Sequence, residues 1–268
     1  MDEKELNNIL SGIYDGEISV LNMEPLFFEF SFEQLMKITD RGFKKGEMIL
    51  NKAAIYEGFR KNINEFCGAK SVSQYWNLQR AVFDQDGTKR EFSEFLDIAK
   101  GIDQKYNGLR EQSWLLTEQN TAFAQAQAAD QWVRTEQMSE TFPLLQYQTV
   151  GDQRVRPEHR LWDGVIRPVN DEFWQTRYPP NDWNCRCIVI RLRRGQITNL
   201  KHQLDKVNKE LEAEGLTPFK SMKNTSKVFN TNPAKSKYIF KESETQYFAD
   251  AKEAKVKKGK NNYGFGYK

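Results

Sequence analysis

The chain has 268 residues and a formal net charge of +3, with 38% hydrophobic, 29% charged and 13% aromatic residues. This length is enough to bury a sizeable core in one large domain or two modest ones. The small net charge excludes a surface that is basic throughout, so any contact with nucleic acid must come from a local cluster. No apolar run approaches about 18 residues, so no membrane-spanning helix is expected.

The amino terminus is acidic and polar, whereas a secretory signal peptide begins with basic and then apolar residues. We therefore expect no signal for export. Two of the three cysteines are separated by a single residue, a pattern that does not indicate a disulfide framework. Together these features favour a reducing, cytosolic origin.

The first hundred residues are predicted to be helical. Apolar residues recur at helical spacing from Leu6 to Ile13, and Gly16 ends the stripe. Ser31, with Gln34 three residues later, resembles a capping box at the start of a second helix. Further helices are predicted over 48–66, over 71–83 and from residue 92 to a break at 107–108.

The longest uninterrupted helical pattern runs from Ser113 to Glu140 and is predicted to form the central helix of the fold. Its glutamines are expected on the other faces of the helix. Small side chains on a buried face let another helix or a sheet approach closely. The residues predicted to share that buried face are Leu115, Ala122, Ala126, Ala129 and Val133.

After Pro143 the hydrophobic period changes to two, which predicts strands at 145–150, 165–169 and 187–192. The sequence thus indicates an α+β fold: a mainly helical N-terminal region, a small antiparallel sheet packed on a long helix, and an extended C-terminal tail. The expected units are a helical region at 1–108, an α+β core at 109–194, a C-terminal helix at 195–219 and a basic, partly disordered tail at 220–268.

The end of this tail is strongly basic, with six lysines against one glutamate over 252–268 and aromatic residues beside them. Such a segment can attract a nucleic-acid backbone and stack on bases. It can equally be a solvated tail without a partner.

Familiar catalytic signatures are missing from the sequence. It contains no GxxxxGK[ST] phosphate loop, no GxSxG nucleophile elbow and no HExxH zinc-protease motif. With only His159 and His202 present, any mechanism that needs an imidazole must use one of these two. Of the two, His202 is interpreted as a surface residue of the C-terminal helix.

The stretch 152–192 concentrates unusual residues, including three of the six tryptophans and two of the three cysteines. Residues two apart in an extended strand point to one face, so Cys185 and Cys187 are expected to approach His159 together. Two thiolates and an imidazole form a partial zinc set, with Asp163 or water as a fourth ligand. The alternative is that the histidine hydrogen-bonds a neighbour and the cysteines pack as small buried side chains.

An ordered series of motifs runs through the same stretch, with a Thr-Glu pair about thirty residues upstream. The motif residues are Thr117, Glu118, Arg156, Pro157, His159, Asp163, Gly164, Trp174, Pro179, Pro180, Cys185, Arg186 and Cys187. In this order and spacing the chain resembles the phage Mu protein F-like head morphogenesis proteins, most strongly from Arg110 to Leu192.

The resemblance implies a minor head protein of a tailed phage or prophage, located in the virion and made in the bacterial host cytoplasm. It implies association with the portal and with capsid or scaffold protein during procapsid assembly and DNA packaging, and no enzymatic activity. No cofactor is expected apart from a structural zinc at His159, Cys185 and Cys187. The alternative hypothesis is a metal-dependent enzyme or phage-delivered effector that uses these three residues.

Overall fold

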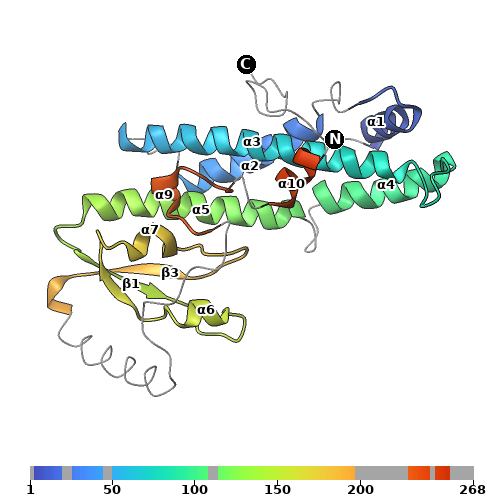
Figure 1. The fold of residues 1–268 in the computed structure, drawn as a ribbon. Helices are drawn as coiled ribbons and strands as arrows, with labels where there is room; N and C mark the ends of the chain where they lie inside the picture. Colours follow the sequence, from blue (N-terminus) through green and yellow to red (C-terminus); the bar gives the residue numbers. More distant parts are fainter. Residues whose placement is uncertain are drawn as a thin grey trace.

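The computed structural model describes residues 3–19, 26–44, 50–107, 114–196, 229–241 and 245–253. Over these ranges the chain has the predicted α+β fold, with many helices and one small sheet (Figure 1). None of the helices in these ranges is both long and apolar enough to cross a membrane.

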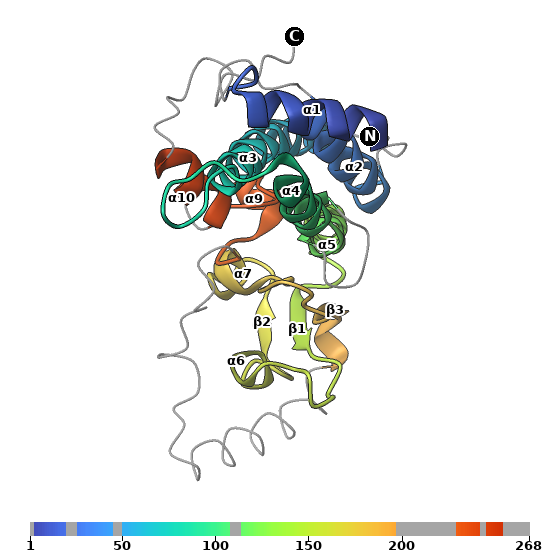
Figure 2. The same ribbon diagram turned by 90° about the vertical axis from the view of Figure 1, so that its right-hand side faces the viewer.

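The elements in chain order are α1 (Glu3–Asp15), α2 (Leu26–Gly42), α3 (Leu50–Ala81), α4 (Phe92–Asn107), α5 (Trp114–Gln137), β1 (Leu144–Gln148), α6 (Pro157–Arg160), β2 (Ile166–Pro168), α7 (Phe173–Arg177), β3 (Ile188–Leu192), η2 (Arg194–Gln196), α9 (Pro233–Ser236) and α10 (Gln246–Glu253). We call α1–α5, α9 and α10 the helical layer, and residues 144–192 the cap. Figures 1 and 2 both place α7 between the helical layer and the sheet.

Helix α5 is the central helix that the alanine pattern predicted, and all five residues of its predicted face are buried. Its small side chains allow α2 to come very close at Gly42. A Cβ at Gly42 would lie 2.5 Å from the backbone oxygen of Phe123 and 3.1 Å from the Cβ of Ala126. The close packing of α2 on α5 therefore needs a glycine on one helix and an alanine on the other.

Two details of the predicted helices are wrong. Residues 50–81 form the single helix α3, where the sequence pattern predicted two helices. Lys70, near the expected break, is fully buried and forms an ion pair with Glu118 of α5, a tertiary contact that the local pattern does not reveal. Ser31 is buried within α2, which begins at Leu26, so it does not form the predicted capping box.

The sheet has the strand order β2-β1-β3, and both pairs are antiparallel, as predicted. Leu145 and Tyr147 of β1 are fully buried, as expected for alternate residues that share one face of a strand. Aromatic side chains fill the space between this face and the helical layer. Tyr178 meets Trp132 of α5 edge to face, with ring centroids 4.9 Å apart.

The segment after residue 229 packs back onto the helical layer. Asn62 of α3 holds it through its side chain: Oδ1 accepts from the backbone N–H groups of Ile239 and Phe240 at 2.9 and 2.8 Å, and Nδ2 donates to the carbonyl of Phe240 at 2.7 Å. The Phe240 ring stacks on Phe66 at 4.0 Å between centroids. Residues 229–241 and 245–253 thus contribute to the core, which differs from the tail predicted from residue 220. Most of the predicted C-terminal helix at 195–219 and nearly all of the basic end at 252–268 lie outside the described residues.

Candidate functional site

Two segments of the cap meet to form the candidate site: the loop and short helix at 152–163, and the connection at 181–187 that leads into β3. Helix α6 begins at Pro157, whose fixed φ suits the first helical position, where a backbone N–H is not needed. His159 lies in this helix and is buried. Its ring stacks on that of Trp162, with centroids 5.3 Å apart.

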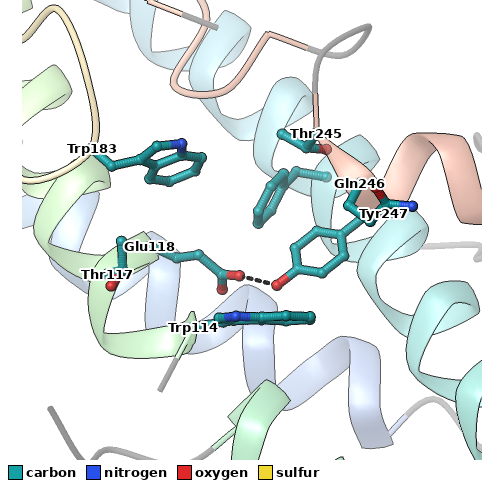
Figure 3. A pocket seen from close by; sticks show the side chains of 8 residues that line it. Trp114, Thr117, Glu118, Trp183, Thr245, Gln246 and Tyr247 are labelled. Carbon is teal, nitrogen blue, oxygen red and sulfur yellow. Dashed lines mark hydrogen bonds between the residues drawn. The ribbon is translucent and has the colours of Figure 1, made fainter. Parts of the chain in front are cut away.

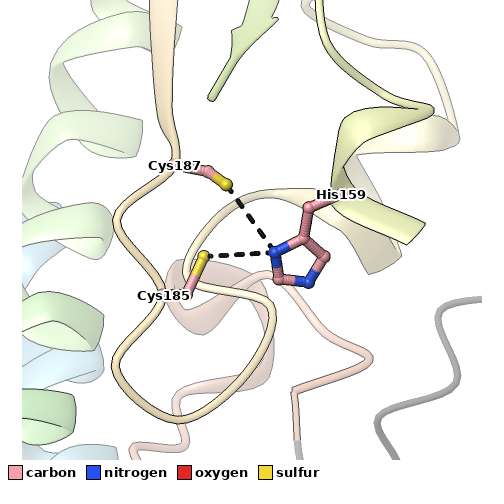
Figure 4. A group of neighbouring side chains, drawn as sticks. All are labelled: His159, Cys185 and Cys187. Carbon is pink, nitrogen blue, oxygen red and sulfur yellow. Dashed lines mark hydrogen bonds between the residues drawn. The ribbon is translucent and has the colours of Figure 1, made fainter. Parts of the chain in front are cut away.

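The predicted group of His159, Cys185 and Cys187 comes together (Figure 4). The Nδ1 atom of His159 lies 3.8 Å from the sulfur of Cys185 and 3.7 Å from that of Cys187. The three candidate ligand atoms all lie within 4.8 Å of one another. Both sulfurs thus face the same ring nitrogen.

The two sulfurs were predicted to approach His159 because their cysteines would lie in one strand. In the structure both cysteines precede β3. Asn184 adopts a left-handed conformation with φ of 54°, which turns the chain before Cys185. Cys185 and Cys187 then both face His159, whereas Arg186, the residue between them, does not join the cluster. The Arg186 guanidinium reaches Asp152 with two hydrogen bonds of 2.7 Å.

Asp163, the predicted alternative for a fourth ligand, is not among the clustered ligand atoms. Its carboxylate instead accepts a 2.6 Å hydrogen bond from the backbone N–H of Thr149. The next residue, Gly164, has φ of 78°, a conformation that favours glycine. Asp163 and Gly164 therefore form the turn that leads into β2.

Hydrogen bonds stabilise negative charge on the Cys185 sulfur. Cys187 donates to this sulfur, His159 contacts it, and the backbone N–H groups of Asn181 and Cys187 also point to it. These contacts lower the pKa of Cys185 although burial opposes the shift. The pKa of Cys187 is raised, first because its proton is held by Cys185 and next because the thiol is buried.

Tyr147 of β1 links this group to the buried Asn181. Asn181 Nδ2 donates to the Tyr147 hydroxyl oxygen at 3.1 Å and to the Arg177 carbonyl at 3.0 Å. The tyrosine hydroxyl in turn donates to Cys187. Burial raises the pKa of Tyr147, so the hydroxyl stays protonated and keeps this donor role.

Ion pairs outside the cluster join the same two segments. Arg156 contacts Asp182 at 2.8 Å and donates to the Trp183 carbonyl at 2.9 Å. The Asp152–Arg186 pair adds a second bridge, and the Arg186 hydrogen bonds lower the pKa of Asp152 to about 2. Several of the predicted motif residues therefore share one task, which is to join 152–163 to 181–187.

The upstream motif pair lies elsewhere, at a pocket of about 310 Å³ between the helical layer and the cap (Figure 3). Thr117 and Glu118 of α5 line it, together with Trp183 of the cap. The Glu118 carboxylate is buried and accepts hydrogen bonds from Lys70 Nζ at 2.7 Å and from the Tyr247 hydroxyl at 2.5 Å. The structure thus does not bring Thr117 and Glu118 to the cysteines.

The remaining motif residues are structural. Trp174 is fully buried, and its carbonyl accepts a 3.2 Å hydrogen bond from Asn232 Nδ2. The bond between Pro179 and Pro180 is cis, and both prolines are buried. Sequence reasoning missed the roles of Lys70, Tyr147 and Tyr247, because residues that pair across distant positions produce no local pattern.

Comparison with known proteins gives matches to the central part of the chain. Residues 90–190 match the family described as Phage Mu protein F like protein. The putative capsid assembly protein F of Escherichia phage Mu is 37% identical over 90 residues, which are 34% of this chain and 20% of that protein. The Mu-like prophage FluMu F protein of Haemophilus influenzae is 34% identical over 100 residues, which are 37% of this chain and 23% of that protein.

These matches confirm the resemblance found in the motif residues, all of which fall within the matched range. The match begins at residue 90 and so includes α4, which precedes the strongest part of the resemblance. The aligned segments span only about a fifth of the length of these two relatives. No solved structure matches this chain.

Proposed function

We propose that this chain is a minor head protein of a tailed phage or prophage and takes part in capsid assembly. The observation that carries the proposal is the match of residues 90–190 to the Mu F-like family, together with a relative named as a capsid assembly protein. We further propose that the chain associates with the portal and with capsid or scaffold protein during procapsid assembly and DNA packaging.

The geometry of the matched region supports a structural role for this chain over an enzymatic one. Its motif residues are used to join loops and to fill the core, as Trp174 and the Asp152–Arg186 pair illustrate. The cavity that borders all three of His159, Cys185 and Cys187 measures about 20 Å³, which is room for one water molecule. A neighbouring cavity of about 280 Å³ includes only Cys185 of the three in its wall. A site that used all three side chains together would therefore have room for water only.

The basic end at 252–268 supports a supplementary role in contacting packaged DNA. Its lysines supply the charge for contacts to phosphates, and its aromatic residues supply surfaces for stacking. This part of the proposal rests on sequence alone. It predicts DNA affinity that falls steeply with salt and disappears when the chain is truncated before Lys252.

The test is a deletion in the phage or prophage that encodes the chain. Purified procapsids are expected to contain the wild-type chain, and its loss is expected to reduce the yield of DNA-filled heads. Complementation with the full chain should restore the yield of DNA-filled heads. Complementation with a chain truncated before Lys252 measures how much of that yield depends on the basic end. Co-expression with the portal protein alone, or with the capsid protein alone, identifies the partner.

A normal yield of filled, infectious particles without the chain would overturn the assembly role. A different result is that wild-type procapsids contain the chain but filled wild-type heads do not. That result would support the assembly role and would show that the protein leaves before the virion is complete.

A further inference from the structure

We propose that His159, Cys185 and Cys187 bind a single zinc ion through Nδ1 and the two sulfur atoms. In a tetrahedral site with Zn–S of about 2.3 Å and Zn–N of about 2.0 Å, each sulfur lies about 3.5 Å from the nitrogen. The two nitrogen–sulfur distances here are 3.8 and 3.7 Å, within tenths of an ångström of that value, and the two sulfurs lie no more than 4.8 Å apart.

The donor set selects the class of metal. Magnesium and calcium require oxygen ligands, which the cluster does not present. Two sulfurs and one imidazole nitrogen are the ligands of zinc sites, and zinc accepts the tetrahedral geometry that a short Cys-x-Cys segment and one histidine allow. Two thiolates and a neutral imidazole balance the charge of Zn²⁺, and the thiol protons pass to solvent on binding.

The surroundings of the sulfurs are those that a thiolate ligand needs. The backbone N–H groups of Asn181 and Cys187 point to the Cys185 sulfur, and the Tyr147 hydroxyl donates to Cys187. Asn181, which is fully buried, orients that hydroxyl through its 3.1 Å hydrogen bond. Donors in this second layer fix the ligands and tune their charge, and their loss commonly weakens metal binding about 10–100-fold.

The fourth coordination position is assigned to a water molecule. Among the described residues, the cluster contains no fourth histidine, cysteine, aspartate or glutamate. The three ligands border the cavity of about 20 Å³, whose wall also includes Val150 and Val155. A cavity of this volume holds about one water.

The proposed ion connects the two segments that the ion pairs also connect. His159 is 26 residues before Cys185, so the ion closes a loop that contains β2 and α7. It thereby fixes α6 against the connection into β3. The Arg156–Asp182 and Asp152–Arg186 pairs join the same two segments, but both are partly open to solvent, so salt weakens them.

The test begins with the full chain, expressed in zinc-supplemented medium and purified under reducing conditions without chelator. Elemental analysis is expected to find about one zinc per chain. Replacement by Co²⁺ should give the visible ligand-field bands of a tetrahedral site and a near-ultraviolet band from thiolate-to-cobalt charge transfer. These spectra are measured on the wild-type chain, so they do not depend on whether a variant folds.

Matched variants assign the ligands. Cys185→Ser, Cys187→Ser and His159→Gln should each lose zinc, whereas Cys67→Ala should retain it, because Cys67 is buried in α3 outside the cluster. A strong chelator should lower the Tm of the wild-type chain, with recovery on adding zinc, and should leave the Tm of Cys187→Ser unchanged.

The proposal is overturned if the wild-type chain carries no zinc and gives no tetrahedral cobalt spectrum when titrated in reduced form. It is equally overturned if zinc persists in a Cys185→Ser/Cys187→Ser double variant, or if mass spectrometry of freshly lysed cells finds the two cysteines joined as a disulfide.

Discussion

The helical layer is held mainly by long apolar faces, supplemented by a few buried polar pairs, whereas the cap has little apolar area per strand and depends on side chains that join its loops. Helix α5 presents a continuous face of alanines and larger apolar residues to its neighbours. In the cap the sheet has only three short strands, and the loops between them are joined by the cysteine–histidine cluster, Tyr147 with Asn181, and two ion pairs.

This difference explains where the recognisable motifs occur. A distributed apolar face tolerates exchange of one hydrophobic residue for another of similar volume. A loop held by a guanidinium, a thiol or a buried amide needs that chemical group at that position. The family match covers α4, α5 and the cap, and most motif residues belong to the cap.

The largest expected effect comes from one of the buried polar groups within the helical layer, formed by Lys70, Glu118 and Tyr247. Glu118→Leu leaves the fully buried Lys70 without its carboxylate, which should lower the free energy of unfolding by about 3–5 kcal/mol in urea titrations followed by circular dichroism. The triple variant Lys70→Met/Glu118→Leu/Tyr247→Phe should regain most of that loss, because no buried polar partner remains.

The control for this prediction is the exposed Arg90–Glu94 pair of α4. Glu94→Gln should change the free energy of unfolding by no more than about 0.5 kcal/mol. If the triple variant is as unstable as Glu118→Leu alone, the loss comes from packing rather than from an uncompensated charge.

A second, smaller effect is expected in the cap from Tyr147→Phe. The change removes the oxygen that accepts from Asn181 and the hydroxyl that donates to Cys187, while the ring is kept. Leaving the buried Asn181 amide with fewer partners should cost about 1–3 kcal/mol, measured by urea unfolding in excess chelator so that metal does not contribute.

Tyr238→Phe is the matched control, because this tyrosine is 48% exposed. Its unfolding free energy should stay within about 0.5 kcal/mol of the wild type. An equal loss of unfolding free energy in both variants would mean that the Tyr147 hydroxyl and its hydrogen bonds do not stabilise the cap.

The order of helices and strands could be predicted from the sequence, because secondary structure depends on local periodicity. Alternation placed Tyr147 in a strand, and alanine spacing identified the buried face of α5. The cysteine spacing also indicated that Cys185 and Cys187 would face His159, since an extended chain returns to the same side every second residue.

The parts that escaped prediction depend on contacts between distant positions. Lys70 pairs with Glu118 across 48 residues, and Asn62 binds Phe240 across 178 residues. A lysine within a helical pattern is normally read as exposed, and an asparagine there as neutral. Only the folded chain shows that α3 needs Lys70 for a buried ion pair and Asn62 to hold the segment around residue 240.

The smallest expected effect concerns the exposed Asp152–Arg186 pair, and its signature is a dependence on pH. The pKa of Asp152 is lowered to about 2 in the folded chain, so the pair contributes stability above the ordinary pKa of the carboxyl and loses it as pH falls toward 2. Asp152→Asn should therefore lower Tm slightly at neutral pH, and its difference from the wild type should disappear between about pH 4 and pH 2. Added salt should also shrink the difference, because both side chains are open to solvent. Asp97→Asn in α4, an exposed aspartate outside the cap, serves as the control. A Tm difference that persists unchanged down to pH 2 would show that Asp152 stabilises the cap through its backbone contacts rather than through its charge.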